Sequence, residues 1–264
     1  MRFLVPKQYV GFLEGQTYPA KFCDADSHWV VRCPGDKAKN LRLASEFIGY
    51  RIAGLLGVPL PRFEIVTITE SFRACHEGKI RTVQAGLATA CEYLESARYP
   101  NFECDELDGF WEQEEYLVIT ATGRIADTWI MNYDRRKKGN LALTGEATAP
   151  HLWFLDFDQS FLSKKPSQLH WIDRNFDEEW LNDDEVLSGF SGRGGARSES
   201  IQRASHFQPA IDRMMSIGEA ELQLILDEIP AEWDISDSSR EQWLKYFLLR
   251  RNVAAQNVRK KYAR

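Results

Sequence analysis

The sequence predicts an α+β protein with a β-rich front and a mainly helical back. Two observations predict this class. Short alternating or apolar runs separated by turn residues fill residues 1–95, where one long amphipathic segment crosses them. Residues 96–264 have mostly helical patterns from about Gly109 onward, and one small hairpin is embedded among them. We therefore divide the chain into a front unit, 1–95, and a back unit, 96–264.

The front unit contains five strand candidates, each bounded by turn residues. In chain order they are YVGFLEG, YPAKFCD, HWVVRC, RFEIVTIT and KIRTVQAGLATA. The first two are joined through Gly15. The turn-forming run DADS precedes the third, so the second and third are expected to pair as a hairpin.

The segment KNLRLASEFIGYRIAGLLG lies between the third and fourth strand candidates and is typical of an amphipathic helix. Gly57 supplies its end, because glycine readily adopts the left-handed conformation that closes a helix. Its apolar residues recur at spacings of three and four: Leu41, Ala44, Phe47, Ile48, Ile52 and Leu55.

The back unit opens with a helical segment, GFWEQEEYLVITATGRIADTWIMN. The strand candidates NLAL and HLWFLDF follow and predict a second hairpin. The remaining helices are expected at about 178–187, 201–215, 219–226 and 239–262.

Composition excludes several classes of protein. The net charge of -6 and pI near 5.5 argue against a general nucleic-acid binder, so no direct nucleic-acid partner is expected. No apolar run approaches a membrane span, and the N-terminus does not resemble a signal peptide. The five cysteines are dispersed and never in CxxC spacing, which is typical of reduced thiols in a cytoplasmic protein. No feature specifies an oligomeric state.

Two polar segments carry the candidate chemistry. In DRRKKGN, Asp134 and Asn140 frame four cations, and downstream Asp156 and Asp158 follow an apolar strand. Phosphoryl transfer uses a carboxylate to orient the attacking hydroxyl, and an amide and a second carboxylate to hold magnesium. Alternatively, each segment is an ordinary solvated loop with capping residues. Their order, with a hairpin between them, favours the phosphoryl-transfer interpretation.

The order WIMNYDRRKKGNLAL…WFLDFDQSF resembles the HipA-like kinases and, more distantly, the phosphoinositide kinases. In the front unit, GQTYPAKF resembles a phosphate-covering loop and WVVR the strand with the nucleotide-contacting lysine. The long helix resembles the one whose glutamate pairs with that lysine. This resemblance spans about residues 11–161. It implies a two-lobed protein-kinase-like fold, with a small β-rich lobe and a larger, mainly helical lobe.

The resemblance also implies roles for the polar residues of the back unit. Asp134 would be the catalytic base, and Asn140 and Asp156 would bind Mg2+. Arg136 or Lys137 stands where the family has a loop histidine. The six-residue step from Asp134 to Asn140 is one longer than is usual in the family.

The remaining implied residues would bind ATP. They are Gly15, Gln16 and Thr17 in the covering loop, Lys21 and Arg32 on the strands, Glu46 on the helix, and Glu92, Tyr93 and Leu94 in a hinge that reads adenine. Arg32 stands where the family usually has lysine. Lys21, on the facing strand, is the alternative cation for the same face.

The implied activity is ATP- and Mg2+-dependent phosphorylation of a protein serine or threonine. Some family members are the toxin of a toxin–antitoxin pair. Three alternatives stay open: a pseudokinase that binds nucleotide without transfer, a small-molecule or lipid kinase, and a non-kinase scaffold. The scaffold would use the acidic run DRNFDEEWLNDDE, at 173–185, to bind a basic partner.

Overall fold

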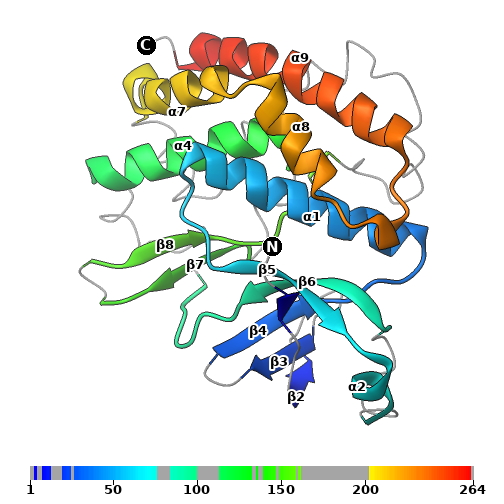
Figure 1. The fold of residues 1–264 in the computed structure, drawn as a ribbon. Coiled ribbons are helices and arrows are strands. Elements are labelled where there is room, and N and C mark those ends of the chain that lie inside the picture. The colour runs from blue at the N-terminus through cyan, green and yellow to red at the C-terminus, as the bar shows by residue number, and fades with distance from the viewer. Residues whose placement is uncertain are drawn as a thin grey trace.

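A sheet on one side and a group of helices on the other make up the described part of the molecule, with helix α1 (Lys37–Leu56) between them (Figure 1). The structure is a computed structural model. It describes residues 3–4, 8–12, 20–24, 27–75, 84–99, 113–132, 135, 139–146, 149–158, 160–161 and 202–262.

The main sheet has six strands in the order β1-β5-β6-β4-β3-β2. They are β1 (Phe3–Leu4), β2 (Gln8–Phe12), β3 (Ala20–Asp24), β4 (Ser27–Arg32), β5 (Phe63–Ile68) and β6 (Gly86–Glu92). Among the described strands of this sheet, only the β1–β5 pair is parallel, and the β3–β4 pair confirms the predicted hairpin. The two-residue β1 was not predicted, because it is too short to give a pattern.

The helical part and a two-stranded sheet follow. They comprise α4 (Glu114–Ile130), β7 (Leu141–Thr144), β8 (His151–Phe154), α7 (Ala204–Ser216), α8 (Glu219–Asp227), the 3-10 helix η4 (Ala231–Trp233) and α9 (Asp237–Lys261). These confirm the second hairpin and three of the four later helices. The helix expected at 178–187 lies outside the described residues. The short α2 (Glu70–Cys75) and η4 were not predicted.

Helix α1 begins two residues before the predicted segment, at Lys37 rather than Lys39, and ends where predicted, at Gly57. The side chain of Asp36 accepts a hydrogen bond from the Lys39 N–H at 2.9 Å and caps the first turn. Gly57 closes the last turn with φ +81°. A residue with a Cβ would be strained there, which explains the glycine.

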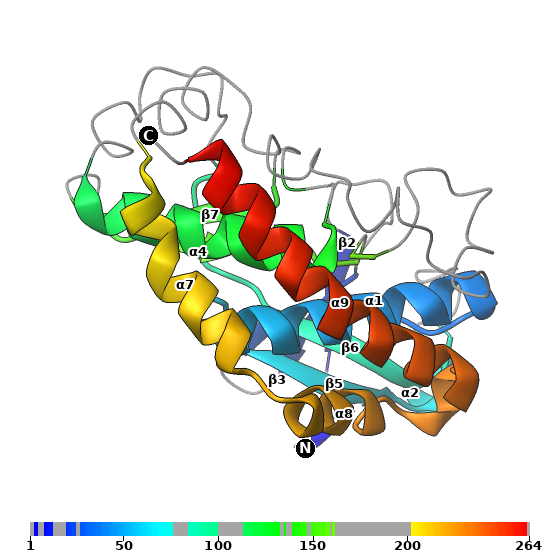
Figure 2. The ribbon, with the colours of Figure 1, turned by 90° about the horizontal axis from the view of Figure 1, so that it is seen from above.

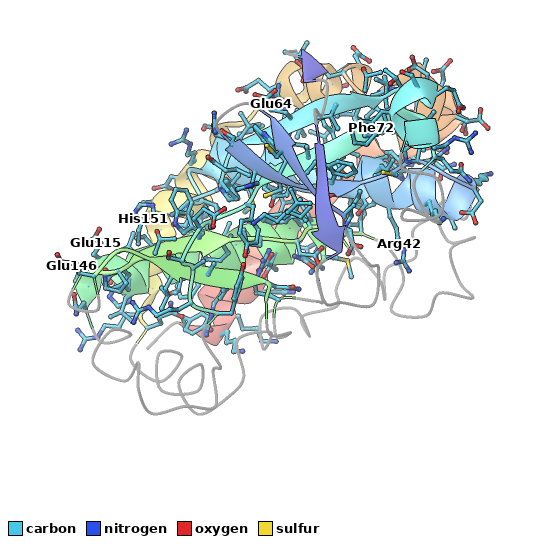
Figure 3. The ribbon with its side chains drawn as sticks, turned by 90° about the horizontal axis from the view of Figure 1, so that it is seen from below. Arg42, Glu64, Phe72, Glu115, Glu146 and His151 are labelled. Carbon is cyan, nitrogen blue, oxygen red and sulfur yellow. The ribbon has the colours of Figure 1, made fainter. Side chains whose placement is uncertain are left out.

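The strand register separates the main sheet into two faces. Arg32 pairs with Thr89 and Thr89 with Ile65, so these three side chains share the face toward α1. The other face carries a separate small core, on which Phe72 of α2 packs against Phe22 with ring centroids 5.2 Å apart (Figure 3). That core consists of Ala20, Phe22, Trp29, Val31, Val66, Ile68, Ala88 and Ala90.

The larger core surrounds α1. It extends from Leu41 through the helices of the back unit to Tyr262. Residues 43–50 are all buried, so this part of the helix is enclosed on every side rather than along one stripe. Figure 2, seen from above, shows α9 crossing over this helical group, with α4, α7 and α8 beneath or beside it.

Close approach to the loop after β8 explains the glycine in the middle of α1. A Cβ on Gly49 would lie 2.5 Å from Cβ of Phe157 and 3.0 Å from Oγ of Ser160. Gly54, on the exposed side of the same helix, has room, since its nearest neighbour, Leu60 Cδ1, would be 3.7 Å away.

We predict that Gly49→Ala destabilises the protein by about 1–3 kcal/mol, because the added methyl group overpacks the contact with Phe157. Gly54→Ala is the matched control. It should be neutral or stabilise the protein by up to about 1 kcal/mol, through helix propensity alone. Urea unfolding of both variants measures the difference. Equal effects of the two substitutions would contradict the close packing at Gly49.

Candidate active site

The β7–β8 hairpin brings the two predicted metal ligands to the same end. Asn140 directly precedes β7, and the Leu155 N–H donates to its carbonyl oxygen at 3.0 Å. Asp156 follows Leu155 and has a left-handed backbone with φ +54°. This conformation is unusual for a residue other than glycine, so the surrounding contacts must hold it.

Arg32 connects the main sheet to both α1 and the loop after β8. One Nη of its guanidinium donates to Glu46, and the other lies 2.9 Å from Asp156 Oδ2. Its Nε lies 3.9 Å from Asp158 Oδ2. Thr89 Oγ1 donates to the other Glu46 oxygen at 2.6 Å. The forked shape of arginine lets one side chain bridge the helix and the loop.

The charges in this network shift one another's pKa values. Burial alone would lower the pKa of Arg32, but the three surrounding carboxyl groups raise it well above its ordinary value. Burial would raise the pKa of Asp156, yet the charge of Arg32 holds it below the usual range. Burial raises the pKa of Glu46 in spite of Arg32. Burial and the adjacent Asp156 raise the pKa of Asp158 to about 7.

Two residues of α1, Ser45 and Tyr50, also hold the loop after β8, through its backbone and through the Phe157 ring. Ser45 Oγ donates to the carbonyl oxygen of Ser160 at 2.6 Å. The Tyr50 ring stacks on Phe63 of β5 at 4.2 Å and meets Phe157 edge-on at 4.9 Å. The loop is therefore fixed to α1 by a hydrogen bond and by an aromatic stack that continues into the sheet.

Arg135 fixes the loop from the other side. It forms two hydrogen bonds to the buried carboxylate of Asp127 on α4, at 2.9 and 3.0 Å. Its Nη1 donates to the carbonyl oxygens of Asn140, at 2.6 Å, and Leu155. The guanidinium also lies 4.6 Å from the Phe157 ring centroid, a cation–π contact. Burial raises the pKa of Asp127 and Arg135 opposes it, so the carboxylate depends on this pairing for its charge.

Lys21 lies on the same sheet face as Arg32 but has other partners. It pairs with Val30 in the β3–β4 register, two residues from Arg32. Its Nζ lies 3.5 Å from the Tyr93 ring centroid and 3.4 Å from Glu95 Oε1. The cation paired with Glu46 is thus Arg32, and Lys21 faces the segment that follows β6.

Residues 92–94, which were predicted to bind adenine through their backbone, begin with the last residue of β6 and are partly hydrogen-bonded within the sheet. The N–H of Glu92 donates to the Arg62 carbonyl oxygen and that of Tyr93 to the His28 carbonyl oxygen, both at 2.8 Å. The Glu92 side chain bonds to Arg62 at 2.8 and 3.1 Å. These contacts fix where the chain leaves β6.

Several predicted site residues lie outside the described part of the chain. They are Asp134, Arg136 and Lys137 of the polar loop, and Gly15, Gln16 and Thr17 of the glycine-containing segment. Two described residues close to Asp134 in the sequence, Asn132 and Arg135, are both hydrogen-bonded to Asp127. Asn132 Nδ2 donates to Asp127 Oδ1 at 3.1 Å, and Arg135 binds the same carboxylate.

The sequence pattern missed some residues that organise the site. Thr89 is a buried hydroxyl between Ala88 and Ala90, and a lone polar residue in an apolar strand was the available signal. Arg135 stood out only as one of four neighbouring cations. Its pairing with Asp127 crosses the end of α4, where helical spacing no longer applies.

The donors of the network suit magnesium. Three carboxyl groups face one guanidinium. Burial and this surplus of acidic groups raise the pKa values of Glu46 and Asp158, which a divalent cation would help to ionise. Among the described residues, no three His, Cys, Asp or Glu side chains are grouped to hold a metal ion. Magnesium requires no such group, because one or two carboxylates, waters and substrate phosphates usually bind it.

Comparison with known proteins links the chain to kinases. A family model described as HipA-like kinase matches residues 12–261. No curated protein matches. The solved structure of a Helicobacter pylori proinflammatory kinase, CtkA, matches with a TM-score of 0.57 and 12% sequence identity, over 98% of this chain and 99% of that chain. At this identity the similarity concerns the fold. Within the described ranges, no helix is long and apolar enough to cross a membrane.

We predict that Asp127→Asn destabilises the protein by about 3 kcal/mol or more, because it leaves the buried Arg135 guanidinium without a counter-charge. Urea unfolding measures the loss. The control is Glu70→Gln, which removes the exposed partner of Arg73 and should change stability by less than about 0.5 kcal/mol. Similar values for both variants would show that the Asp127–Arg135 pair does not hold the loop.

Proposed function

The chain belongs to the family of HipA-like kinases, and we propose that it transfers the γ-phosphoryl group of ATP, with magnesium, to a serine or threonine of a protein. The observation that carries this proposal is the network in which Arg32 joins Glu46 to Asp156. It unites a strand cation, a helix carboxylate and a loop carboxylate, the groups that position nucleotide and metal in phosphoryl transfer.

We further propose that residues 1–95 and 96–264 act as two lobes with ATP between them. The sheet with α1 would form the small lobe, and the helices with the β7–β8 hairpin the larger one. The face shared by Arg32, Thr89 and Lys21 supports this arrangement, because it carries cations and is directed toward the hairpin end.

In this proposal Arg32 binds the phosphates in place of the usual lysine. Its pairing with Glu46 supports the assignment, since Lys21 pairs with Glu95 instead. Two N–H groups of residues 92–94 are already bonded within the sheet. The N–H of Leu94 would therefore be the hinge donor to adenine, with Lys21 beside Tyr93 at that end of the site.

The proposed chemistry is an in-line attack by the substrate hydroxyl. Asp134 would orient this hydroxyl and accept its proton. Asn140 and Asp156 would hold magnesium, which when bound neutralises charge on the phosphate oxygens. Arg135 would keep both ligands in place through the carbonyl oxygens of Asn140 and Leu155.

One observation favours a second candidate, a protein that binds nucleotide without transferring phosphate. The guanidinium of Arg32 contacts Asp156, the proposed metal ligand, directly. A chain that kept this contact with nucleotide bound would lack a free carboxylate for magnesium. The acidic run at 173–185, which a scaffold role would use, lies outside the described residues.

A phosphoryl-transfer assay separates these two candidates. We predict that Asp134→Asn lowers transfer of labelled γ-phosphate to protein about a hundredfold or more, because the attacking hydroxyl loses its base. Binding of ADP with magnesium, measured by thermal shift, should be retained. If the wild-type protein binds the nucleotide but shows no transfer that Asp134→Asn abolishes, the non-transferring candidate is correct.

A second comparison tests which cation binds the phosphates. We predict that Arg32→Ala weakens ADP–magnesium binding at least about tenfold, because a phosphate-binding charge with a buried carboxylate partner is lost. Lys21→Ala, on the same face, should weaken it less. Calorimetric titration of both variants gives the dissociation constants. A larger loss of affinity for Lys21→Ala would show that Lys21, and not Arg32, binds the phosphates.

A further inference from the structure

Trp233 of η4 is inserted between α1 and β6. It is 1% exposed, and its indole Nε1 donates to the carbonyl oxygen of Leu87 at 2.8 Å. Its ring meets Phe47 of α1 edge-on, with centroids 6.2 Å apart. The segment between α8 and α9 therefore contacts a strand and a helix of the front unit at once, through a single side chain.

The two residues that Trp233 contacts are neighbours of the Arg32 network. Phe47 directly follows Glu46 on α1, and Leu87 lies two residues before Thr89 on β6. Thr89 in turn donates to Glu46 Oε2 at 2.6 Å. A displacement of α1 from β6 would thus change the Trp233 contacts and the Glu46–Thr89 hydrogen bond together.

The segment that carries Trp233 is held at both ends. Arg240 of α9 donates to the carbonyl oxygens of Ile229 and Ile235, each at 3.3 Å. Arg51 of α1 forms an ion pair with Glu228 at 2.7 Å. Because these contacts fix its backbone, the segment can transmit the position of α8 and α9 to α1. Figure 1 shows α8 and this segment next to α1.

We propose that Trp233 is a positioning residue for the nucleotide site: it fixes α1 against β6 and so keeps Glu46 at Arg32 and Thr89. This inference rests on the proposed role of Glu46 in organising the phosphates. A helix enclosed by the C-terminal helices cannot swing outward without unpacking them. The C-terminal segment is therefore part of what forms the nucleotide site, although it supplies no group that contacts ATP.

The test compares Trp233→Phe with a matched control, Trp129→Phe. Phenylalanine keeps an apolar ring and removes the indole hydrogen bond. Trp129 of α4 is 0% exposed and donates from Nε1 to the Phe247 carbonyl oxygen at 2.9 Å, so the control loses an equivalent buried bond elsewhere in the core. Thermal unfolding of both variants shows how much general stability each has lost.

Two measurements then follow. In the protein without nucleotide, Trp233→Phe should speed amide hydrogen exchange across 43–50 about tenfold, and Trp129→Phe should not. Calorimetric titration with ADP and magnesium should give about fivefold weaker binding for Trp233→Phe, the factor expected for one net hydrogen bond. In a Glu46→Gln background this loss should disappear, because Trp233 acts through Glu46.

The outcomes separate this inference from the proposed function. Equal exchange in the two tryptophan variants, or an undiminished loss of affinity in the Glu46→Gln background, would overturn the positioning role. If the wild-type protein binds no ADP while exchange across 43–50 still responds only to Trp233→Phe, control of α1 by Trp233 is supported. In that case the absence of ADP binding contradicts the proposed function alone, and the positioning role of Trp233 stands.

Discussion

The middle of helix α1, residues 43–50, is buried on every side, so each polar group that it carries into the core needs a partner. Ser45 and Glu46 are such groups. Ser45 bonds to the backbone of the loop after β8, and Glu46 bonds to Arg32 and Thr89 of the sheet. The hydrogen bonds that these two buried side chains require therefore bring together the strand cation, the helix carboxylate and the loop. The site follows from the same requirement that makes the core stable.

Two arginines, Arg32 and Arg135, fix the loop after β8. Arg32 binds the carboxylate of Asp156, whereas Arg135 binds the carbonyl oxygen before it and covers the Phe157 ring. Opposing contacts of this kind explain how Asp156 keeps a left-handed backbone. A lysine at position 32 would present one point charge and could not bridge Glu46 and Asp156 with a planar fork.

Much of the fold was predictable because its elements are local. The helix ending at Gly57, both hairpins and three of the four late helices follow from periodicity and turn residues, and the structure confirms them. The enclosure of α1 was not predictable, because an apolar spacing of three and four indicates only one packed face. The site depended on pairings distant in sequence. Register places Lys21 and Arg32 on one face, but only the tertiary structure shows that Arg32 reaches Glu46 and Lys21 reaches Glu95.

The larger core, which runs from Leu41 to Tyr262, has a consequence for synthesis on the ribosome. The strands of the main sheet and α1 emerge before α7, α8 and α9, which cover α1, so the apolar surface of α1 lacks its native cover until those helices have been made. The front unit cannot complete its packing as an early, independent unit. Assembly of the Arg32 network is thereby coupled to the emergence of α7, α8 and α9, and a nascent fragment without them would expose apolar surface of the kind that chaperones bind.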